Sequence, residues 1–307
     1  MSGFGVNRLN KPTHSPEEGF VFVIETTTAD ETFTIPCQDV GTFDVLVDWG
    51  DGSFSTITAF DDADLAHTYA EAGEHTIRIT GTFPNIYFNS TGDKLKITKV
   101  RNLGKVGWLS LSRAFRDCEN LTEFTVGNTD TSNVTAMDLM LRGTAVTVAD
   151  LSRLDTSSVI NMLGLFALST SLTSVNVSSF NTANVARMLA FLNNCSSLQY
   201  IDVSNFDTSS VENFGLAFAS LSSLTDIIGL DNFNIEAVTT LNNFANDTTI
   251  PTNRYDALLI SWAAQSVNSG VTANFGNSTY TAGGAAEAAR NTLINTYGWT
   301  ITDGGAA

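Results

Sequence analysis

The segment FNTANVARMLAFLNNCSSLQYIDVSNFDTSSV (residues 180–211) decides the fold, because its pattern returns along the chain. Apolar side chains stand at positions 185, 188 and 192, an i, i+3, i+7 pattern that also begins at residues 108, 134, 159 and 211. A degraded copy begins at residue 238, and successive starts lie 25–27 residues apart. This spacing is typical of one face of a helix. The sequence therefore predicts one short helix in each repeat.

A second apolar pattern follows each expected helix. It reads LxxVxV at residues 172–177 and LxxIxV at residues 198–203, and this alternation predicts a short strand. A loop such as FDT (residues 206–208) then supplies polar acceptors for the N–H groups of the next helix. Because a single unit cannot bury its own apolar face, we expect the repeats to stack into a solenoid with a narrow parallel sheet.

Two recurring positions have structural interpretations. Asp155, Asn181, Asp207 and Asn234 occupy one column of the repeat, where we expect their side chains to bond to the backbone of the turns. Cys118 and Cys195 share another column, three repeats apart. At about 4.8 Å per repeat they would lie about 14 Å apart, too far for a disulfide. We therefore expect buried thiols.

The first part of the chain has a different period. Apolar residues alternate with polar ones over residues 43–49, and segments 20–25 and 31–35 also have the composition of strands. The tight turn WGDGS (residues 49–53) and the segment HTY (residues 67–69) separate later strands. These short strands predict a small β-sandwich.

Two resemblances to known families rest on these motifs. WGDGS, HTY and AGEHTIRITG (residues 72–81) resemble the polycystic-kidney-disease (PKD) type of immunoglobulin-like domain over about residues 18–82. Members of that family usually serve as spacers or binding modules on extracellular proteins and virions.

The second resemblance covers about residues 92–247. DTSNV (residues 130–134) and DTSSV (residues 155–159 and 207–211), at the 25–27-residue spacing, resemble the BspA-type, leucine-rich-repeat-like repeat of bacterial surface proteins. Few of the usual Met-Phe pairs are present. Members of that family are adhesins and cell-surface or phage proteins that bind through the solenoid surface, so the resemblance implies a binding role. It assigns no catalytic residues to this chain.

These patterns predict a multidomain fold: an all-β immunoglobulin-like (PKD) sandwich followed by an α/β leucine-rich-repeat-like solenoid with a C-terminal helix-strand cap. Two helices, at residues 255–265 and 285–298, and a final strand form the expected cap. The expected boundaries are an N-terminal arm at residues 1–17, the sandwich at 18–91, five to six solenoid repeats at 92–250 and the cap at 251–307.

The charge balance excludes several classes of partner. The chain has 15 basic and 32 acidic residues, giving a net charge of −17. Nucleic-acid binding requires Lys and Arg to displace counterions, so neither nucleic acid nor an anionic membrane surface is expected as a partner. No apolar run reaches the roughly 18 residues that a membrane span needs. With no export signal visible, we expect synthesis in the cytoplasm without classical export.

The search for chemistry finds no motif of a hydrolase, a nucleotide-binding loop or a metalloprotease. The histidines, at positions 14, 67 and 75, precede the repeats. The acidic residues of the N-terminal part are expected to be turn acceptors and solvated acids, although Ca²⁺ binding stays open for Asp48, Asp51, Asp61, Asp62 and Asp64. We expect no catalytic, cofactor-binding or metal-binding residues, and no enzymatic activity.

The expected function is that of a non-catalytic phage virion surface protein, a tail, fibre or capsid-decoration subunit for assembly and host attachment. Its expected partners are other virion proteins or further copies of itself, and a host surface glycan or protein. Phe4, Val6 and Leu9 are candidate docking anchors, or alternatively part of a strand that packs on the same chain. The alternatives are a bacterial adhesin and a glycan depolymerase. One sequence does not assign the ligand-binding residues of the solenoid.

Overall fold

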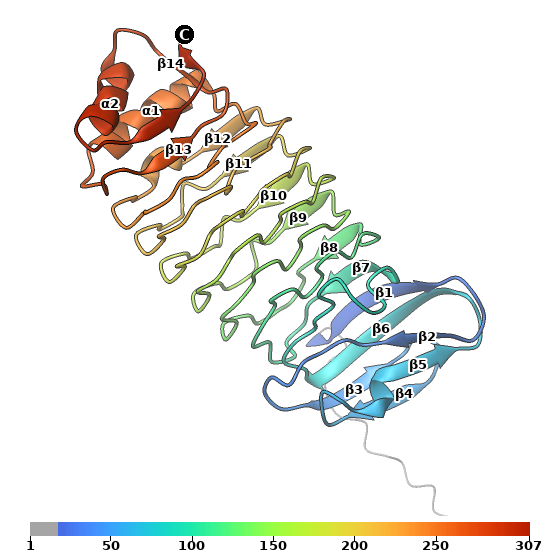
Figure 1. Ribbon diagram of the computed structural model, residues 1–307. Coiled ribbons are helices and arrows are strands. Elements are labelled where there is room, and N and C mark those ends of the chain that lie inside the picture. Colours follow the sequence, from blue (N-terminus) through green and yellow to red (C-terminus); the bar gives the residue numbers. More distant parts are fainter. Residues whose placement is uncertain (1–17) are drawn as a thin grey trace, which may run out of the picture.

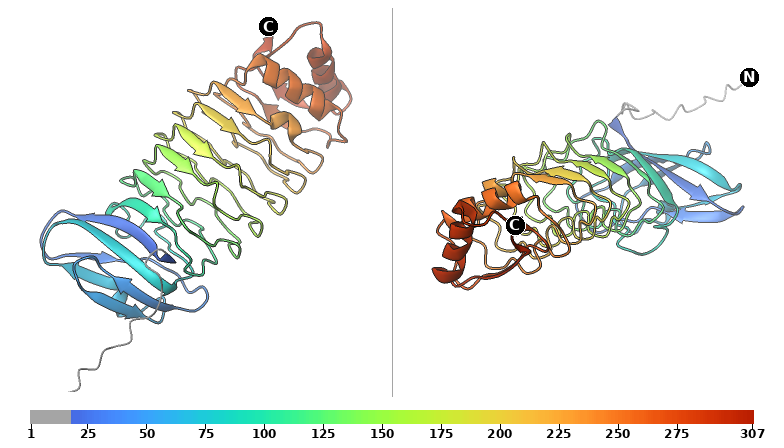
Figure 2. Two further views of the ribbon diagram at one scale, coloured as in Figure 1. Left: turned by 180° about the vertical axis from the view of Figure 1, so that it is seen from behind. Right: turned by 90° about the horizontal axis from the view of Figure 1, so that it is seen from above.

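The computed structural model describes residues 18–307 as an elongated molecule. Strands of the N-terminal part form one end, a stack of similar coils forms the middle, and two helices lie at the other end (Figure 1). Figure 2 shows the short strands side by side along one long face of the stack, with turns along the opposite side. Buried apolar side chains form a single continuous core from Phe20 to Trp299.

Most of the strands belong to one ten-stranded sheet with the order β12-β11-β10-β9-β8-β7-β1-β6-β3-β4. Its N-terminal strands are antiparallel, and those from β7 onward are parallel. Their bounds are β1 (Phe20–Thr26), β3 (Asp44–Asp48), β4 (Phe54–Ile57), β6 (Gly73–Thr82), β7 (Ile97–Asn102), β8 (Glu123–Thr125), β9 (Val148–Asp150), β10 (Ser174–Asn176), β11 (Tyr200–Asp202) and β12 (Asp226–Ile228).

The remaining elements lie outside this sheet. Strands β2 (Glu31–Thr34) and β5 (Ala66–Tyr69) form an antiparallel pair, and single 3-10 turns are found at η2 (Ala63–Leu65) and η3 (Leu230–Asn232). The C-terminal elements are α1 (Thr252–Ala263), β13 (Thr272–Asn274), β14 (Thr279–Tyr280), α2 (Ala285–Asn295), β15 (Thr300–Thr302) and β16 (Gly305–Ala306). Neither helix has the length and apolar character needed to span a membrane, and the described residues contain no other candidate span.

The expected fold class was wrong in two respects. First, the N-terminal strands do not form a separate immunoglobulin-like sandwich, because β1 pairs with β6 on one side and with β7 on the other. The sheet of the N-terminal part therefore continues without a break into the sheet of the stack. Second, α1 and α2 are the only α-helices of the described residues, so the repeats do not contain the helices of an α/β leucine-rich-repeat-like solenoid.

Backbone hydrogen bonds explain why the repeats contain no helix. In an α-helix each N–H bonds to the carbonyl four residues earlier. Here the N–H groups of Leu139 and Leu141 instead donate to carbonyls of the next repeat, those of Leu163 and Leu165, at 2.8 and 2.9 Å. The intervening N–H of Met140 closes a tight turn onto the carbonyl of Met137 at 3.3 Å. The repeat is thus a run of turns that is bonded sideways to its neighbour.

Left-handed backbone conformations mark these turns. Within one repeat Leu139 has φ 56° and Gly143 has φ 68°, and in the next repeat Gly164 has φ 57° and Leu168 has φ 62°. Right-handed helices do not tolerate such residues at every fourth position. The i, i+3, i+7 pattern remains satisfied, since tight turns of this period also point their apolar side chains inward.

A column of buried threonines ties the corners of the coils together. We call Thr131, Thr156, Thr182 and Thr208, each 1% exposed, the threonine ladder. The Thr156 hydroxyl donates to the carbonyl of Asn181 at 2.9 Å and accepts from the N–H of Asn181 at 2.8 Å. Each of the other three hydroxyls likewise donates to a carbonyl of the following repeat. The ladder satisfies backbone groups at a corner where strand pairing has ended.

The C-terminal elements complete the last repeat. Gln265 accepts from the N–H of Ile235 at 2.8 Å and donates to the carbonyl of Phe233 at 2.8 Å, where a further repeat would otherwise bond. Trp262 donates to the carbonyl of Leu230 at 3.0 Å. On the turn side, β13 bonds to the last coil, with the N–H of Ala245 on the carbonyl of Asn274 at 2.8 Å.

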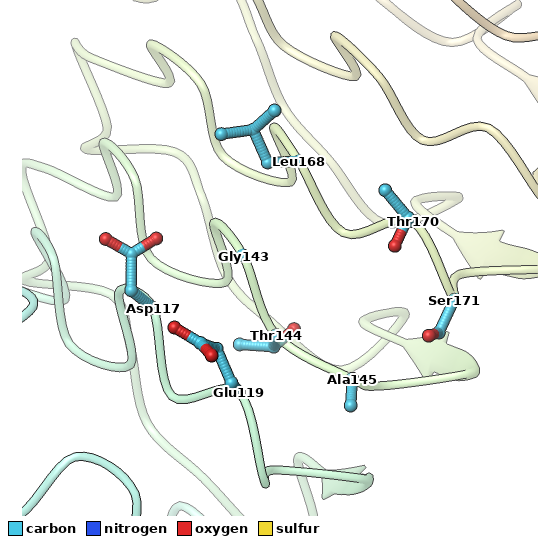
Figure 3. Close-up of a pocket in the computed structure, with 8 residues that line it drawn as sticks. All are labelled: Asp117, Glu119, Gly143, Thr144, Ala145, Leu168, Thr170 and Ser171. Atoms are coloured by element: carbon cyan, nitrogen blue, oxygen red, sulfur yellow. The ribbon is translucent and has the colours of Figure 1, made fainter.

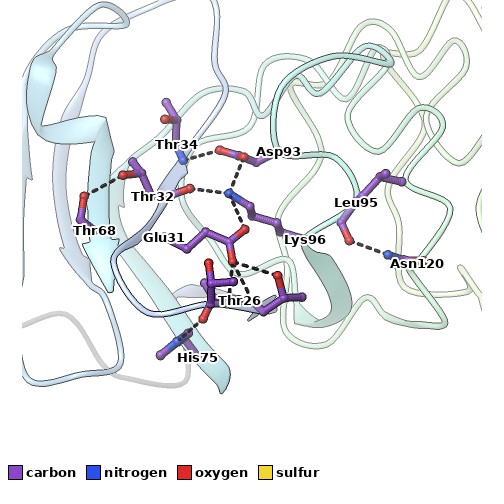
Figure 4. A network of polar contacts seen from close by, with 12 residues as sticks. Thr26, Glu31, Thr32, Thr34, Thr68, His75, Asp93, Leu95, Lys96 and Asn120 are labelled. Carbon is purple, nitrogen blue, oxygen red and sulfur yellow. Dashed lines mark hydrogen bonds and ion pairs between the residues drawn. The ribbon is translucent and has the colours of Figure 1, made fainter. Parts of the chain in front are cut away.

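Ion pairs join the N-terminal part to the start of the stack (Figure 4). The Lys96 ammonium lies 2.8 Å from Asp93 and 3.2 Å from Glu31, and it also donates to the carbonyl of Thr32. Asp93 accepts from the N–H of Thr34 at 2.8 Å. These contacts fix β2 against the segment that enters β7.

The threonine ladder gives a direct test of the stacking. Thr156→Val keeps the shape of the side chain but leaves the N–H and the carbonyl of Asn181 without their partner. We expect the free energy of unfolding to fall by about 2–3 kcal/mol. Thr173→Val is the control, because its exposed hydroxyl makes one bond, to the carbonyl of Thr147, and should cost no more than about 0.5 kcal/mol. Equal losses in urea denaturation would contradict the assigned role of the ladder.

The turn conformation predicts an unusual response to glycine. Ala190 has φ 57°, and Gly164 already occupies the equivalent position of the preceding repeat. Ala190→Gly should raise the free energy of unfolding by about 0.5–1 kcal/mol, since a left-handed non-glycine residue costs about 1–2 kcal/mol and only a methyl group is lost. In a helix the same change would lower it by about 1 kcal/mol. Urea denaturation distinguishes the two signs.

Candidate functional site

One polar cluster of the N-terminal part surrounds His67. Its ring stacks on Trp49 with ring centroids 4.8 Å apart, and its Nε2 lies 2.7 Å from a carboxylate oxygen of Asp51. The Ser53 hydroxyl donates to Asp51 at 2.5 Å and lies 3.4 Å from the same Nε2. Tyr69 closes the cluster by donating to the carbonyl of Trp49 at 3.0 Å.

This arrangement differs from that of a Ser-His-Asp hydrolase. In such a triad the serine and the acid contact opposite nitrogens of the imidazole, so that one nitrogen takes the serine proton while the acid orients the ring and stabilises the imidazolium. Here Ser53 and Asp51 meet the same nitrogen of His67, and the serine hydroxyl points to the acid. The cluster therefore braces the WGDGS turn against β5.

Hydrogen bonds also occupy most acids that were considered for Ca²⁺. Asp48 accepts from the N–H of Gly50 at 3.1 Å, and Asp62 accepts from the N–H groups of Thr58 and Asp64, each at 3.1 Å. Among residues 18–307 no group of three or more His, Cys, Asp and Glu side chains is placed to hold a metal ion.

The Asp and Asn side chains that recur at one position of the repeat bond to the backbone of the turns, as the sequence predicts. Asp155 accepts from the N–H of Ser157 at 2.9 Å, and Asn181 accepts from the N–H of Ala183 at 3.1 Å. Asp207 and Asn234 make the same contact with the residues two positions later. These side chains shape the turns beside the threonine ladder.

The three cysteines are free thiols. Cys118 and Cys195 are fully buried, and the Cys195 thiol donates to the carbonyl of Phe166 at 3.1 Å. Burial raises the pKa of both far above the usual value for a thiol, and it raises the pKa of Cys37 to about 11. The prediction of buried thiols at the repeat positions is confirmed.

A depression of about 360 Å³ spans three successive repeats on the turn side (Figure 3). Asp117 and Glu119 line one end, and Leu168, Thr170 and Ser171 line the other. Both acids already have cationic partners: Arg142 contacts Asp117, and the Lys94 ammonium lies 3.0 Å from Glu119. These carboxylates are thus used in holding neighbouring coils together.

The strand face has a second depression, a shallow groove of about 390 Å³ between β10 and β11. We call it the Tyr200 groove; its lining residues are Ser174, Val175, Asn176, Val177, Ser178, Tyr200, Asp202, Ser204 and Asn205. Tyr200 is 45% exposed on this face. Sequence reasoning did not single out this groove. The sequence did contain a signal for it: Tyr200 is an aromatic residue at an outward strand position, and the equivalent position of the preceding repeat is occupied by Ser174.

The candidate docking residues Phe4, Val6 and Leu9 lie outside the described residues. Their proposed role in binding a partner stays a prediction.

Comparison with known proteins gives one match. A family described as "Mycoplasma protein of unknown function, DUF285" matches residues 109–225 and, in a second alignment, residues 173–281. The two overlapping matches together span more than half of the chain, and they are consistent with the expected BspA-type surface repeats. No curated protein and no solved structure matches the chain.

The His67 cluster predicts a specific loss of stability in acid. Burial alone raises the pKa of Asp51, but hydrogen bonds from Ser53 and His67 outweigh it and bring the pKa down to about 2. As the pH falls, the Asp51 carboxylate is therefore protonated in the unfolded chain before it is protonated in the folded one. Its stabilisation of the fold is present above about pH 4 and is lost as the pH falls to about 2. After allowance for an exposed fraction of 30%, the contribution is about 1 kcal/mol.

The free energy of unfolding, measured by urea denaturation at each pH, should fall between pH 5 and pH 2. Asp51→Asn should make this fall smaller by about 1 kcal/mol. Asp61→Asn is the matched control, because the Asp61 carboxylate accepts no hydrogen bond from residues 18–307. An unchanged pH profile for Asp51→Asn would contradict the assignment.

Proposed function

The chain belongs to the family described as "Mycoplasma protein of unknown function, DUF285", and we propose that it is a non-catalytic attachment protein displayed on the outside of a phage particle. The stack would be its binding part. The N-terminal part, whose WGDGS and HTY motifs resemble PKD domains, would join the stack to the particle. Other particle proteins or further copies of this chain are the proposed partners at that end.

The observation that carries this proposal is the outward face of the strands β8 to β12. Each of these strands has one buried residue between two side chains that point away from the core. Strand pairing and the ladder hold the backbone beneath them, so outward side chains that make no hydrogen bond within residues 18–307, such as Val148, Ser174 and Tyr200, can vary without loss of the fold. The outward residues are Glu123, Thr125, Val148, Asp150, Ser174, Asn176, Tyr200, Asp202, Asp226 and Ile228. Stacked repeats commonly bind ligands through such extended surfaces.

A bacterial adhesin is the second candidate, and the family match favours it. The matching family is described from a bacterium, and its surface repeats fit display on a cell as well as on a particle. The two candidates share the binding face and differ in the carrier. At His67 the serine and the acid meet the same ring nitrogen, so this cluster gives no support to a hydrolase of the Ser-His-Asp type for either carrier.

Immunogold electron microscopy with an antibody to the stack separates the candidates. We expect gold on the exterior of intact phage particles from the producing culture, and the protein in their mass spectrum. Gold on intact bacterial cells, with unlabelled particles, would instead support the adhesin. Particles and cells that lack the gene are the control. Label on neither surface would contradict attachment altogether.

A further inference from the structure

The register of the strands leaves one side of the Tyr200 ring open. Tyr200 lies opposite Asp226 on β12 and opposite Ser174 on β10, and beyond Ser174 the same row continues with Val148 on β9. Val148 is 57% exposed. Val148 and Tyr200 are two strand spacings apart, about 10 Å, with only the small serine between them. Ser174 is therefore too small to cover the Tyr200 ring on this side, and Tyr200 is the one aromatic side chain that lines the groove.

Several polar groups of the groove make no hydrogen bond within the described residues, although the side chains of Asn176 and Asn205 do. Within residues 18–307 the hydroxyls of Ser174, Ser178, Ser204 and Tyr200 have no hydrogen-bond partner, and only one carboxylate oxygen of Asp202 is used, accepting from the N–H of Ser204 at 2.9 Å. Other hydroxyls of the stack do bond internally, as in the threonine ladder and at Ser157 and Ser209. These donors and acceptors are available to a ligand.

Charge narrows the class of ligand. The residues that line the groove include one carboxylate, Asp202, and neither Lys nor Arg. Arg254, close by, is held by Asp226 through two bonds of 3.0 Å. An anionic ligand would meet an unopposed negative charge in the groove, in a chain of net charge −17. The charge therefore argues against an anionic ligand, and the uncharged polar groups, which outnumber the one carboxylate, favour a neutral polar ligand over a cation.

We propose that the Tyr200 groove binds a neutral glycan, an inference that rests on the proposed attachment function and assigns its ligand class and site. A sugar ring presents an apolar C–H face that packs on an aromatic ring, and hydroxyls that both donate and accept. Tyr200 supplies the ring, Asp202 supplies an acceptor, and the serine hydroxyls supply donors and acceptors. A polypeptide partner fits less well, because protein interfaces centre on clusters of buried anchor residues and the groove offers one aromatic residue.

The test uses the fluorescently labelled full-length protein on an array of immobilised neutral and acidic glycans, with immobilised polypeptides on the same slide. The wild-type protein should bind neutral glycans. Tyr200→Ala should weaken that binding about tenfold or more, the size of effect typical of a central aromatic contact. Tyr200→Phe keeps the ring and should retain most of the binding.

Ile160→Ala is the matched control, because Ile160 is a 55%-exposed apolar residue outside the groove and its removal should leave binding unchanged. The melting temperature of each variant shows that the exposed substitutions leave the fold intact. Binding only to acidic glycans, only to polypeptides or to nothing on the array would overturn the proposal, as would equal binding by Tyr200→Ala. Immunogold labelling of particles or cells does not depend on these results. A negative glycan array would therefore overturn the glycan site without overturning the proposed attachment function.

Discussion

The structure depends on one constraint: each coil satisfies its backbone N–H and C=O groups through the next coil. An N–H left unbonded in the interior costs free energy comparable to a lost hydrogen bond, so every side of a coil needs a partner. Strand pairs provide it on one face, the threonine ladder provides it at a corner, and the turn segments provide it on the opposite side, as between Leu139 and Leu163. Each coil is thus stable only within the stack.

This constraint also determines the ends and the composition. At the first coil β7 pairs with β1, and at the last coil Gln265 and β13 bond to the groups that a further repeat would have met. Ser, Thr, Asn and Asp recur in the coils because short polar side chains reach the backbone of their own turn or of the next coil. Lysine cannot accept a hydrogen bond, and none follows Lys105.

The sequence predicted the repeat length, the short strands, the turn role of Asp155 and Asn181, and the buried thiols. All of these follow from the spacing of residue types within a single repeat. It did not predict the lack of helices, because tight turns with left-handed residues such as Leu168 bury the same i, i+3, i+7 positions. The sheet that continues through β1, and the Tyr200 groove, were also missed. Both depend on which segments become neighbours in space, which a repeat pattern does not specify.

The hydrogen bonds between the turns of neighbouring coils therefore hold together both the fold and the strand face that we propose as the binding surface. Scalar couplings across hydrogen bonds, measured by NMR on deuterated, ¹⁵N,¹³C-labelled protein, observe them directly. We expect a coupling between the amide nitrogen of Arg113 and the carbonyl carbon of Asp138, because the Arg113 N–H donates to the Asp138 carbonyl oxygen at 2.8 Å, and the equivalent coupling from Leu139 to Leu163. Couplings from these amides to carbonyls four residues earlier would show helices in the repeats and contradict this expectation.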